Sequence, residues 1–106
     1  MSVNPQDRVF PALASLPRRR MLAFLGQTAL STDDLARDFG MSAPAVSRHL
    51  AVLLRAGLVS AERQGRRVLY RLNREELLGA LARYASELDG PLRRPMPAPR
   101  PPREAI

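Results

Sequence analysis

FGMSAPAVSRHLAVLLRAGLV, residues 39–59, predicts a turn followed by a helix of about four turns. Ser42 is a typical N-cap, and Pro44 is tolerated because it falls in the first turn. Apolar residues recur at the i, i+4, i+7, i+8 spacing of one buried face: Val46, Leu50, Leu53 and Leu54. The opposite face is neither acidic nor strongly hydrophilic, since it holds Pro44, Ala45, Arg48, Val52 and Arg55. That outer face indicates a helix that lies against something other than water.

The segments on either side of this helix extend the pattern. Residues 31–40, STDDLARDFG, predict a short helix that Ser31 or Thr32 caps and Gly40 ends. In residues 58–72 the apolar period changes from helical to alternating, and RQGRR (63–67) supplies a glycine-containing hairpin turn. Two short helices, a short turn between them and an arginine-tipped hairpin predict a winged helix-turn-helix. In that geometry the second helix enters the DNA major groove, and the hairpin reaches the backbone or the minor groove.

Helices are also predicted before and after this unit. Residues 7–16 and 17–27 form the first two, with Pro11 in a first turn, Pro17 at a helix start, and Met21, Leu22 and Leu25 facing inward. Residues 73–88 form the last, where Asn73 and Glu76 have capping-box spacing. The fold class is therefore mainly α (α+β), with a two-stranded β-hairpin wing. We assign residues 1–89 to one DNA-binding and dimerisation domain, and expect the proline- and arginine-rich residues 90–106 to be disordered.

Composition narrows the function classes. The 106 residues suit one domain, and the net charge of +7 favours an anionic partner, nucleic acid before membrane. The chain has no cysteine and one histidine, which excludes thiolate chemistry and leaves no nucleophile–base pair for an enzyme. No apolar run is long enough to span a membrane, and residues 1–10 show no signal-peptide pattern, so we expect a cytoplasmic protein.

Candidate DNA-binding residues follow from the winged-helix geometry. On the recognition helix they are Ser42, Ala43, Pro44, Ser47, Arg48 and His49; on the wing they are Arg63, Arg66 and Arg67. The small residues let the backbone approach base edges, and Arg48 has the planar fork that suits guanine O6 and N7. His49 lies at the edge of the buried stripe, where a packed or hydrogen-bonded role competes with DNA contact. We expect one or two of the arginines at 18–20 to pair with acids such as Asp7 or Asp38.

The first and last helices carry apolar stripes that need a surface to cover them. The residues are Val9, Phe10 and Leu13 at one end of the chain, and Leu77, Leu81, Tyr84 and Leu88 at the other. A self-complementary homodimer interface is the natural place to bury both stripes.

Three segments together resemble the ArsR/SmtB family of bacterial winged-helix repressors. They are residues 9–25 (VFPALASLPRRRMLAFL), residues 31–59 (STDDLARDFGMSAPAVSRHLAVLLRAGLV) and residues 63–73 (RQGRRVLYRLN). The resemblance covers roughly residues 8–88. It implies homodimers that pair through their first and last helices and repress by occupying operator DNA, here an inverted repeat. It also implies release by a metal ion in many members.

The chain departs from that family where metal binding is concerned. Ser31, Thr32 and Asp33 stand where the family has its metal-binding cysteine pattern, and the last helix has no histidines. The chain therefore resembles the metal-independent, SdpR-like type, which implies no metal site and no cofactor. The family's usual Asp-Pro-Thr is replaced by Ser15, Leu16 and Pro17, which still suit a helix start.

A second function class remains as an alternative. A winged-helix module can bind protein, and residues 94–103, RPMPAPRPPR, suit a polyproline ligand for a partner's groove. The tail is also compatible with an inert extension or a non-specific DNA tether. Retention on duplex DNA as salt is varied separates these classes, because a protein-binding module gives a weak salt slope.

Overall fold

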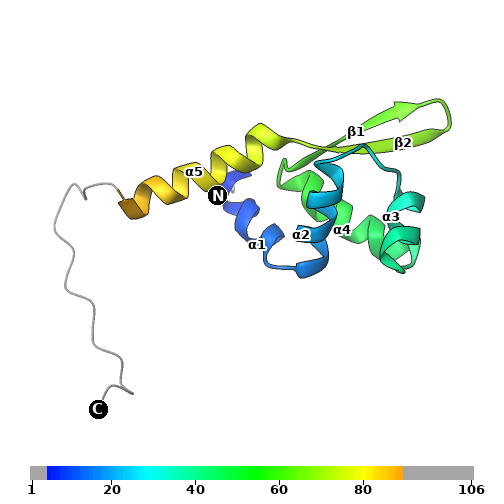
Figure 1. Ribbon diagram of the computed structural model, residues 1–106, viewed down its shortest axis with the longest axis horizontal. Coiled ribbons are helices and arrows are strands. Elements are labelled where there is room, and N and C mark those ends of the chain that lie inside the picture. Colours follow the sequence, from blue (N-terminus) through cyan, green and yellow to red (C-terminus); the bar gives the residue numbers. More distant parts are fainter. Residues whose placement is uncertain (1–4, 90–106) are drawn as a thin grey trace, which may run out of the picture.

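The computed structural model describes residues 5–89 and confirms a mainly helical winged helix-turn-helix with a two-stranded wing (Figure 1). In chain order the elements are η1 (Pro5–Arg8), α1 (Val9–Leu13), α2 (Leu16–Leu25), α3 (Thr32–Phe39), α4 (Ala43–Arg55), β1 (Val59–Gln64), β2 (Arg67–Leu72) and α5 (Arg74–Asp89). The helices α1 to α4 gather into one body, from which the hairpin extends on one side and α5 on the other. The predicted tail, residues 90–106, lies outside the described residues.

The core forms where α2, α3 and α4 meet. Its fully buried side chains include Met21, Leu35, Val46, Leu50 and Leu53, and Leu58 closes it after α4. Leu54, predicted to be buried, is instead 39% exposed. The buried stripe of α4 is centred between Leu50 and Leu53, which places Leu54 beyond its edge.

Side-chain caps fix both helices of the helix-turn-helix. Ser31 Oγ accepts from the backbone N–H of Asp34 at 3.1 Å, and Asp34 Oδ2 accepts from the N–H of Ser31 at 3.0 Å, which completes a capping box. Ser42 Oγ accepts from the N–H of Ala45 at 3.2 Å and so caps α4. Gly40 ends α3 in the left-handed conformation at φ +62°, which glycine adopts without steric penalty. The starts of both helices and the turn between them are therefore set by local sequence.

The first two helices differ slightly from the predicted segments. The N-cap of α2 is Ser15, whose Oγ accepts from the N–H of Arg18 at 3.4 Å, and the helix begins at Leu16 rather than at Pro17. Because Ser15 is extended, α1 ends at Leu13. The side chain of Leu16 therefore does not continue the buried face of α1 and is 50% exposed.

The wing is a regular hairpin with a two-residue turn. Gln64 pairs with Arg67, leaving Gly65 and Arg66 as the central residues, and Gly65 has φ +62°. At the base of the hairpin, Leu30 and Tyr70 exchange two backbone hydrogen bonds of 2.8 and 3.1 Å. This extra bridge attaches the wing to the segment just before α3.

The last helix is poorly covered by the rest of the protomer. Only Ala80 among its side chains is buried, whereas Leu78, Leu81, Tyr84 and Leu88 are between 40% and 68% exposed. Phe10 and Tyr84 meet edge to face at 5.3 Å between ring centroids, which links α5 to α1. The predicted capping box at Asn73 and Glu76 is absent from the hydrogen bonds of the described residues; the Asn73 amide donates to the Gly57 carbonyl oxygen at 3.0 Å.

Candidate nucleic-acid interface

The predicted DNA-reading residues of α4 lie in its first two turns. Ser42, Pro44, Ser47 and Arg48 are exposed, and Ala43 and His49 are half-buried. The Ser42 hydroxyl oxygen is committed to the cap of the helix. In the part of the chain that the structure describes, the guanidinium of Arg48 has no bonding partner, so all its donors are available. An unbonded guanidinium beside small side chains forms a surface that fits the edge of a base pair.

The side chain of His49 is hydrogen-bonded to Arg18 of α2. Nη1 of Arg18 donates to Nδ1 of His49 at 3.3 Å, while Nε donates to the Ala12 carbonyl oxygen at 2.7 Å and Nη2 to the Pro11 carbonyl oxygen at 3.2 Å. Arginine cannot accept, so Nδ1 accepts and the ring proton of neutral His49 sits on Nε2. One side chain of α2 thus joins the end of α1 to the recognition helix.

The expected pairing of the arginines at 18–20 with Asp7 or Asp38 is wrong for the described residues. Besides the bonds of Arg18, Nη1 of Arg19 donates to the Leu13 carbonyl oxygen at 2.6 Å. The last carbonyls of a helix lack partners within it, and the two arginines satisfy those at the end of α1.

The environment of His49 favours its neutral form. Burial lowers the pKa of His49 below the usual 6.5, and the positive charges of Arg18 and Arg48 lower it further. Protonation of Nδ1 would remove the acceptor that Arg18 uses and place two cations against each other. The contact between α2 and α4 therefore depends on a neutral imidazole.

We expect the thermal unfolding temperature to fall as the pH decreases through the histidine range. In the unfolded chain His49 takes up a proton near pH 6.5, and in the folded chain only at lower pH. The unfolded state therefore binds more protons in this window, and stability is lost as pH falls through the folded pKa. His49 is the chain's only histidine, so a pH series of thermal melts with His49→Gln isolates it. Parallel curves for wild type and variant would contradict the prediction.

The three predicted wing arginines have different environments. Arg66 is exposed at the turn, and Arg63, also exposed, donates from Nε to the Gly65 carbonyl oxygen at 3.3 Å. Arg67 instead reaches back to α3, where Nη2 donates to Asp34 Oδ2 at 2.8 Å and to Ser31 Oγ at 3.4 Å. Arg63 and Arg66 stay candidates for DNA contact, whereas Arg67 is better placed to hold the wing against α3.

Asp34 is the residue of α3 to which the wing is bonded through Arg67. It completes the capping box of α3 and also accepts from Arg37 at 3.0 Å, with its side chain 19% exposed. Hydrogen bonds from the Ser31 backbone and side chain lower the pKa of Asp34 below 3.8, and Arg37 and Arg67 add to this effect. The carboxylate that starts α3 is therefore ionised and bonded to the wing.

The arginines of the recognition helix, the wing and the start of α5 fall into two groups according to their hydrogen bonds with the rest of the chain. Residues 42–74 hold seven arginines and one acid, Glu62. Four of the seven are engaged, because Arg63, Arg67, Arg71 and Arg74 bond to Gly65, Asp34, Glu62 and Gly26. Among the described residues nothing bonds to the other three, Arg48, Arg55 and Arg66. Their charges are the ones most available to an external polyanion.

Comparisons with known proteins identify the family of this chain. A family model of bacterial regulatory proteins, the ArsR family, matches residues 17–61. The transcriptional repressor SdpR of Bacillus subtilis is 34% identical over 67 residues, which make up 63% of this chain and 74% of SdpR. The chain belongs to the ArsR family.

Other relatives differ from this chain in length, and a solved structure has the same fold. The regulator KmtR of Mycobacterium tuberculosis is 41% identical over 69 residues, 65% of this ArsR-family chain and 53% of KmtR, so the chain spans about half of that relative. A homodimeric winged helix-turn-helix DNA-binding domain from Mycobacterium bovis superposes with a TM-score of 0.67 at 28% identity, covering 86% of this chain and 94% of that one. The relatives also include a probable mercury resistance operon repressor of Streptomyces lividans, so membership does not by itself set the signal.

In this ArsR-family chain the tip and the base of the wing should respond differently to mutation. We expect Arg66→Ala to weaken binding to all duplexes nearly alike and to reduce the salt slope by about one unit for one lost phosphate contact. Arg67→Ala should instead lower the unfolding temperature, because Asp34 loses its partner on the wing. The measurements are fluorescence anisotropy at several salt concentrations and thermal melts of both variants. A full slope change for Arg67→Ala at an unchanged melting temperature would show that Arg67 contacts phosphate.

The predicted dimer residues lie on α1 and α5, and one of them needs a different assignment. Val9 is 4% exposed and belongs to the protomer's own core, so it has little surface left for a partner. Phe10, Leu81, Tyr84 and Leu88 are exposed, and Leu13 and Leu77 are half-buried. Leu78, 54% exposed, lies next to this stripe on α5 and is not among the predicted residues.

Two further properties of residues 5–89 bear on other partners. No helix there is long and apolar enough to cross a membrane. In the same residues, no three histidine, cysteine, aspartate or glutamate side chains lie close enough to hold a metal ion together.

Proposed function

We propose that the chain is a homodimeric, sequence-specific DNA-binding repressor of the ArsR type that does not respond to metal ions. The observation that carries DNA reading is the free guanidinium of Arg48, which stands among small residues on the exposed face of a capped recognition helix. Arg66 at the wing tip adds a second free cation for the backbone or the minor groove.

The homodimer is supported by the uncovered apolar face of α1 and α5. Six residues define this dimer face: Phe10, Leu13, Leu77, Leu81, Tyr84 and Leu88. The helix α5 projects from the body (Figure 1), so a second copy can cover it without blocking α4. Exposed apolar patches of this kind are typical of interaction sites, and a two-fold axis would present two recognition helices to one duplex.

Metal independence is supported by how the start of α3 is used. Ser31 and Asp34 bond to each other, and the cationic Arg67 bonds to both. These oxygens already accept hydrogen bonds, and a guanidinium lies beside them where a metal ion would need negative charge. Soft and borderline metals prefer thiolate and imidazole ligands. The chain has no cysteine and a single histidine.

We expect zinc, cadmium, copper or arsenite to leave operator affinity unchanged within about a factor of two, because no suitable ligand set is available. The measurement is anisotropy binding with and without one equivalent of each ion, with chelator-treated protein as the control. A tenfold loss of affinity would contradict this and point to an oxygen-ligand site, with Glu87 or Asp89 as first candidates.

The proposed function is tested by selecting binding sites from a random duplex pool. A dimer should enrich an inverted repeat whose half-site centres lie about 34 Å apart, one turn of the double helix. The enriched site is then sought near the protein's own gene. Recovery of random sequences with a weak salt slope would reject the repressor and favour the protein-binding module.

A further inference from the structure

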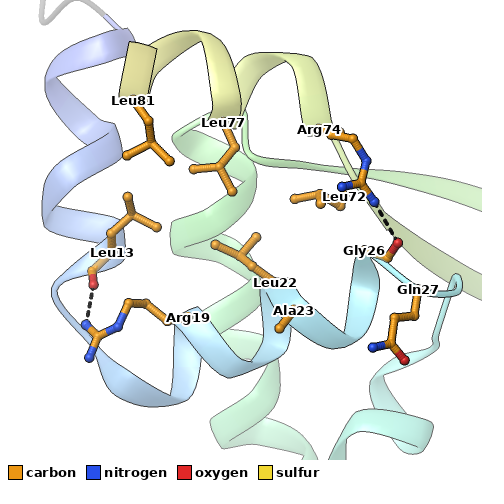
Figure 2. Close-up of a pocket in the computed structure, with 10 residues that line it drawn as sticks. All are labelled: Leu13, Arg19, Leu22, Ala23, Gly26, Gln27, Leu72, Arg74, Leu77 and Leu81. Carbon is orange, nitrogen blue, oxygen red and sulfur yellow. Dashed lines mark hydrogen bonds between the residues drawn. The ribbon is translucent and has the colours of Figure 1, made fainter. Parts of the chain in front are cut away.

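A cavity of about 530 Å³ lies between α1, α2, the end of β2 and the first turns of α5 (Figure 2). Its apolar lining consists mainly of five leucines: Leu13, Leu22, Leu72, Leu77 and Leu81. This volume and this lining are typical of sites for small organic ligands.

Two arginines line the cavity, and one of them, Arg19, donates to the Leu13 carbonyl oxygen at 2.6 Å. The other, Arg74, donates from Nη2 to the Gly26 carbonyl oxygen at 2.8 Å. A smaller depression of about 190 Å³ adjoins the cavity, shares Arg74 and Gly26 with it, and adds Arg71 and Thr28. A guanidinium has five N–H donors, so Arg74 keeps four for a ligand.

The acids nearest to Arg74 in the sequence, Glu75 and Glu76, line a separate hollow that Arg74 also borders. Among the described residues that line the cavity or the adjoining depression, none is aspartate or glutamate. Arg74 has no ion-pair partner in residues 5–89; Arg71 pairs with Glu62 at 3.2 Å. A purely apolar occupant would fill the cavity and leave the charges of Arg19 and Arg74 without a counterpart inside it.

We propose that the cavity binds an anionic amphiphile, with its acid group at Arg74 and its hydrocarbon chain among the five leucines. The residues that line the cavity connect it to the dimer face and to the recognition helix. Leu13, Leu77 and Leu81 belong to the dimer face, and α2 is bonded to the recognition helix through Arg18 and His49. A hydrocarbon chain bound between α2 and α5 shifts α5 relative to α4 and so weakens operator binding. This regulatory part rests on the proposed function.

The binding part is tested on the full chain without DNA, using decanoate below its micellar concentration as the anionic probe and decanol as the uncharged match. We expect calorimetry to show decanoate binding about tenfold more tightly than decanol, the difference that a charge-assisted hydrogen bond makes. Arg74→Gln should remove most of this preference, because Arg19 stays in the lining. Arg20→Gln, an exposed arginine of α2 outside the lining, is the matched control and should retain it.

A second variant guards against a folding defect in Arg74→Gln. Ala23 lines the cavity from α2, and Ala23→Leu narrows it without changing any charge. It should reduce the affinity for both probes. Equal affinity for decanoate and decanol in the wild type would overturn the anionic class, and binding of neither would show that the cavity takes no such ligand.

The regulatory part is tested by anisotropy on the selected operator. Decanoate should lower the operator affinity of the wild type about fivefold or more, and that of Ala23→Leu much less. Decanoate that binds without changing operator affinity would overturn the coupling. A chain that binds no duplex at all would instead reject the proposed function, while the calorimetric result would still stand for the cavity.

Discussion

Leu81→Arg is expected to halve the particle mass measured by light scattering at micromolar concentration and to weaken operator binding at the same time. Leu81 is 40% exposed in the protomer, so the fold has room for a longer side chain there. In the dimer the same position would bury an unpaired charge, at a cost of about 3–5 kcal/mol. DNA binding falls with dimerisation because one recognition helix alone contacts only half of the operator.

Leu16→Arg is the matched control for this prediction. Leu16 is 50% exposed on α2 and is not part of the dimer face, so the variant should keep the dimer mass and the operator affinity. A wild-type monomer that binds the operator tightly would defeat the dimer proposal. The proposal would also fail if Leu81→Arg and Leu16→Arg had the same mass and the same operator affinity.

Arg48→Ala is expected to reduce affinity for the selected operator by about 1–3 kcal/mol and to flatten the base preference at one position of each half-site. The side chain is exposed and has no partner among the described residues, so its removal leaves the fold intact. The loss should be much smaller on a scrambled duplex, since base-edge contacts carry sequence preference and phosphate contacts do not.

Arg55→Ala provides the comparison within the same helix. Arg55 is exposed at the last turn of α4, far from the small residues at its start, and should affect both duplexes alike. Anisotropy titrations of both variants against both duplexes give the answer. If Arg48→Ala lowered affinity equally for the two duplexes, Arg48 would be a phosphate contact, and specificity would pass to Ala43, Pro44 and Ser47.

The parts of the fold that the sequence predicts are those set by neighbouring residues. Ser31, Ser42 and Gly40 act within one helical turn of their own positions, so the caps and the turn between α3 and α4 follow from residue type and spacing. The two-residue hairpin turn is equally local, because Gly65 supplies the positive φ.

The side-chain partners could not be predicted in this way. Arg18 meets His49 at a separation of 31 residues, and Arg67 meets Asp34 at a separation of 33. Such pairs depend on how the helices pack, and arginines compete for carbonyl oxygens as well as for acids. The pairing of the arginines at 18–20 with acids relied on charge alone, and the predicted DNA contact of Arg67 took no account of its bond to Asp34.

The bond from Arg18 also limits which bases His49 can recognise. With Nδ1 occupied by a donor, the neutral ring offers only the Nε2 hydrogen, so it can give a hydrogen bond but not receive one. Within the major groove, guanine N7 and O6, adenine N7 and thymine O4 accept such a bond, whereas the amino group of cytosine does not. A base that accepts a hydrogen bond from neutral His49 there cannot be cytosine, and this restriction comes from an arginine of α2 rather than from the recognition helix itself.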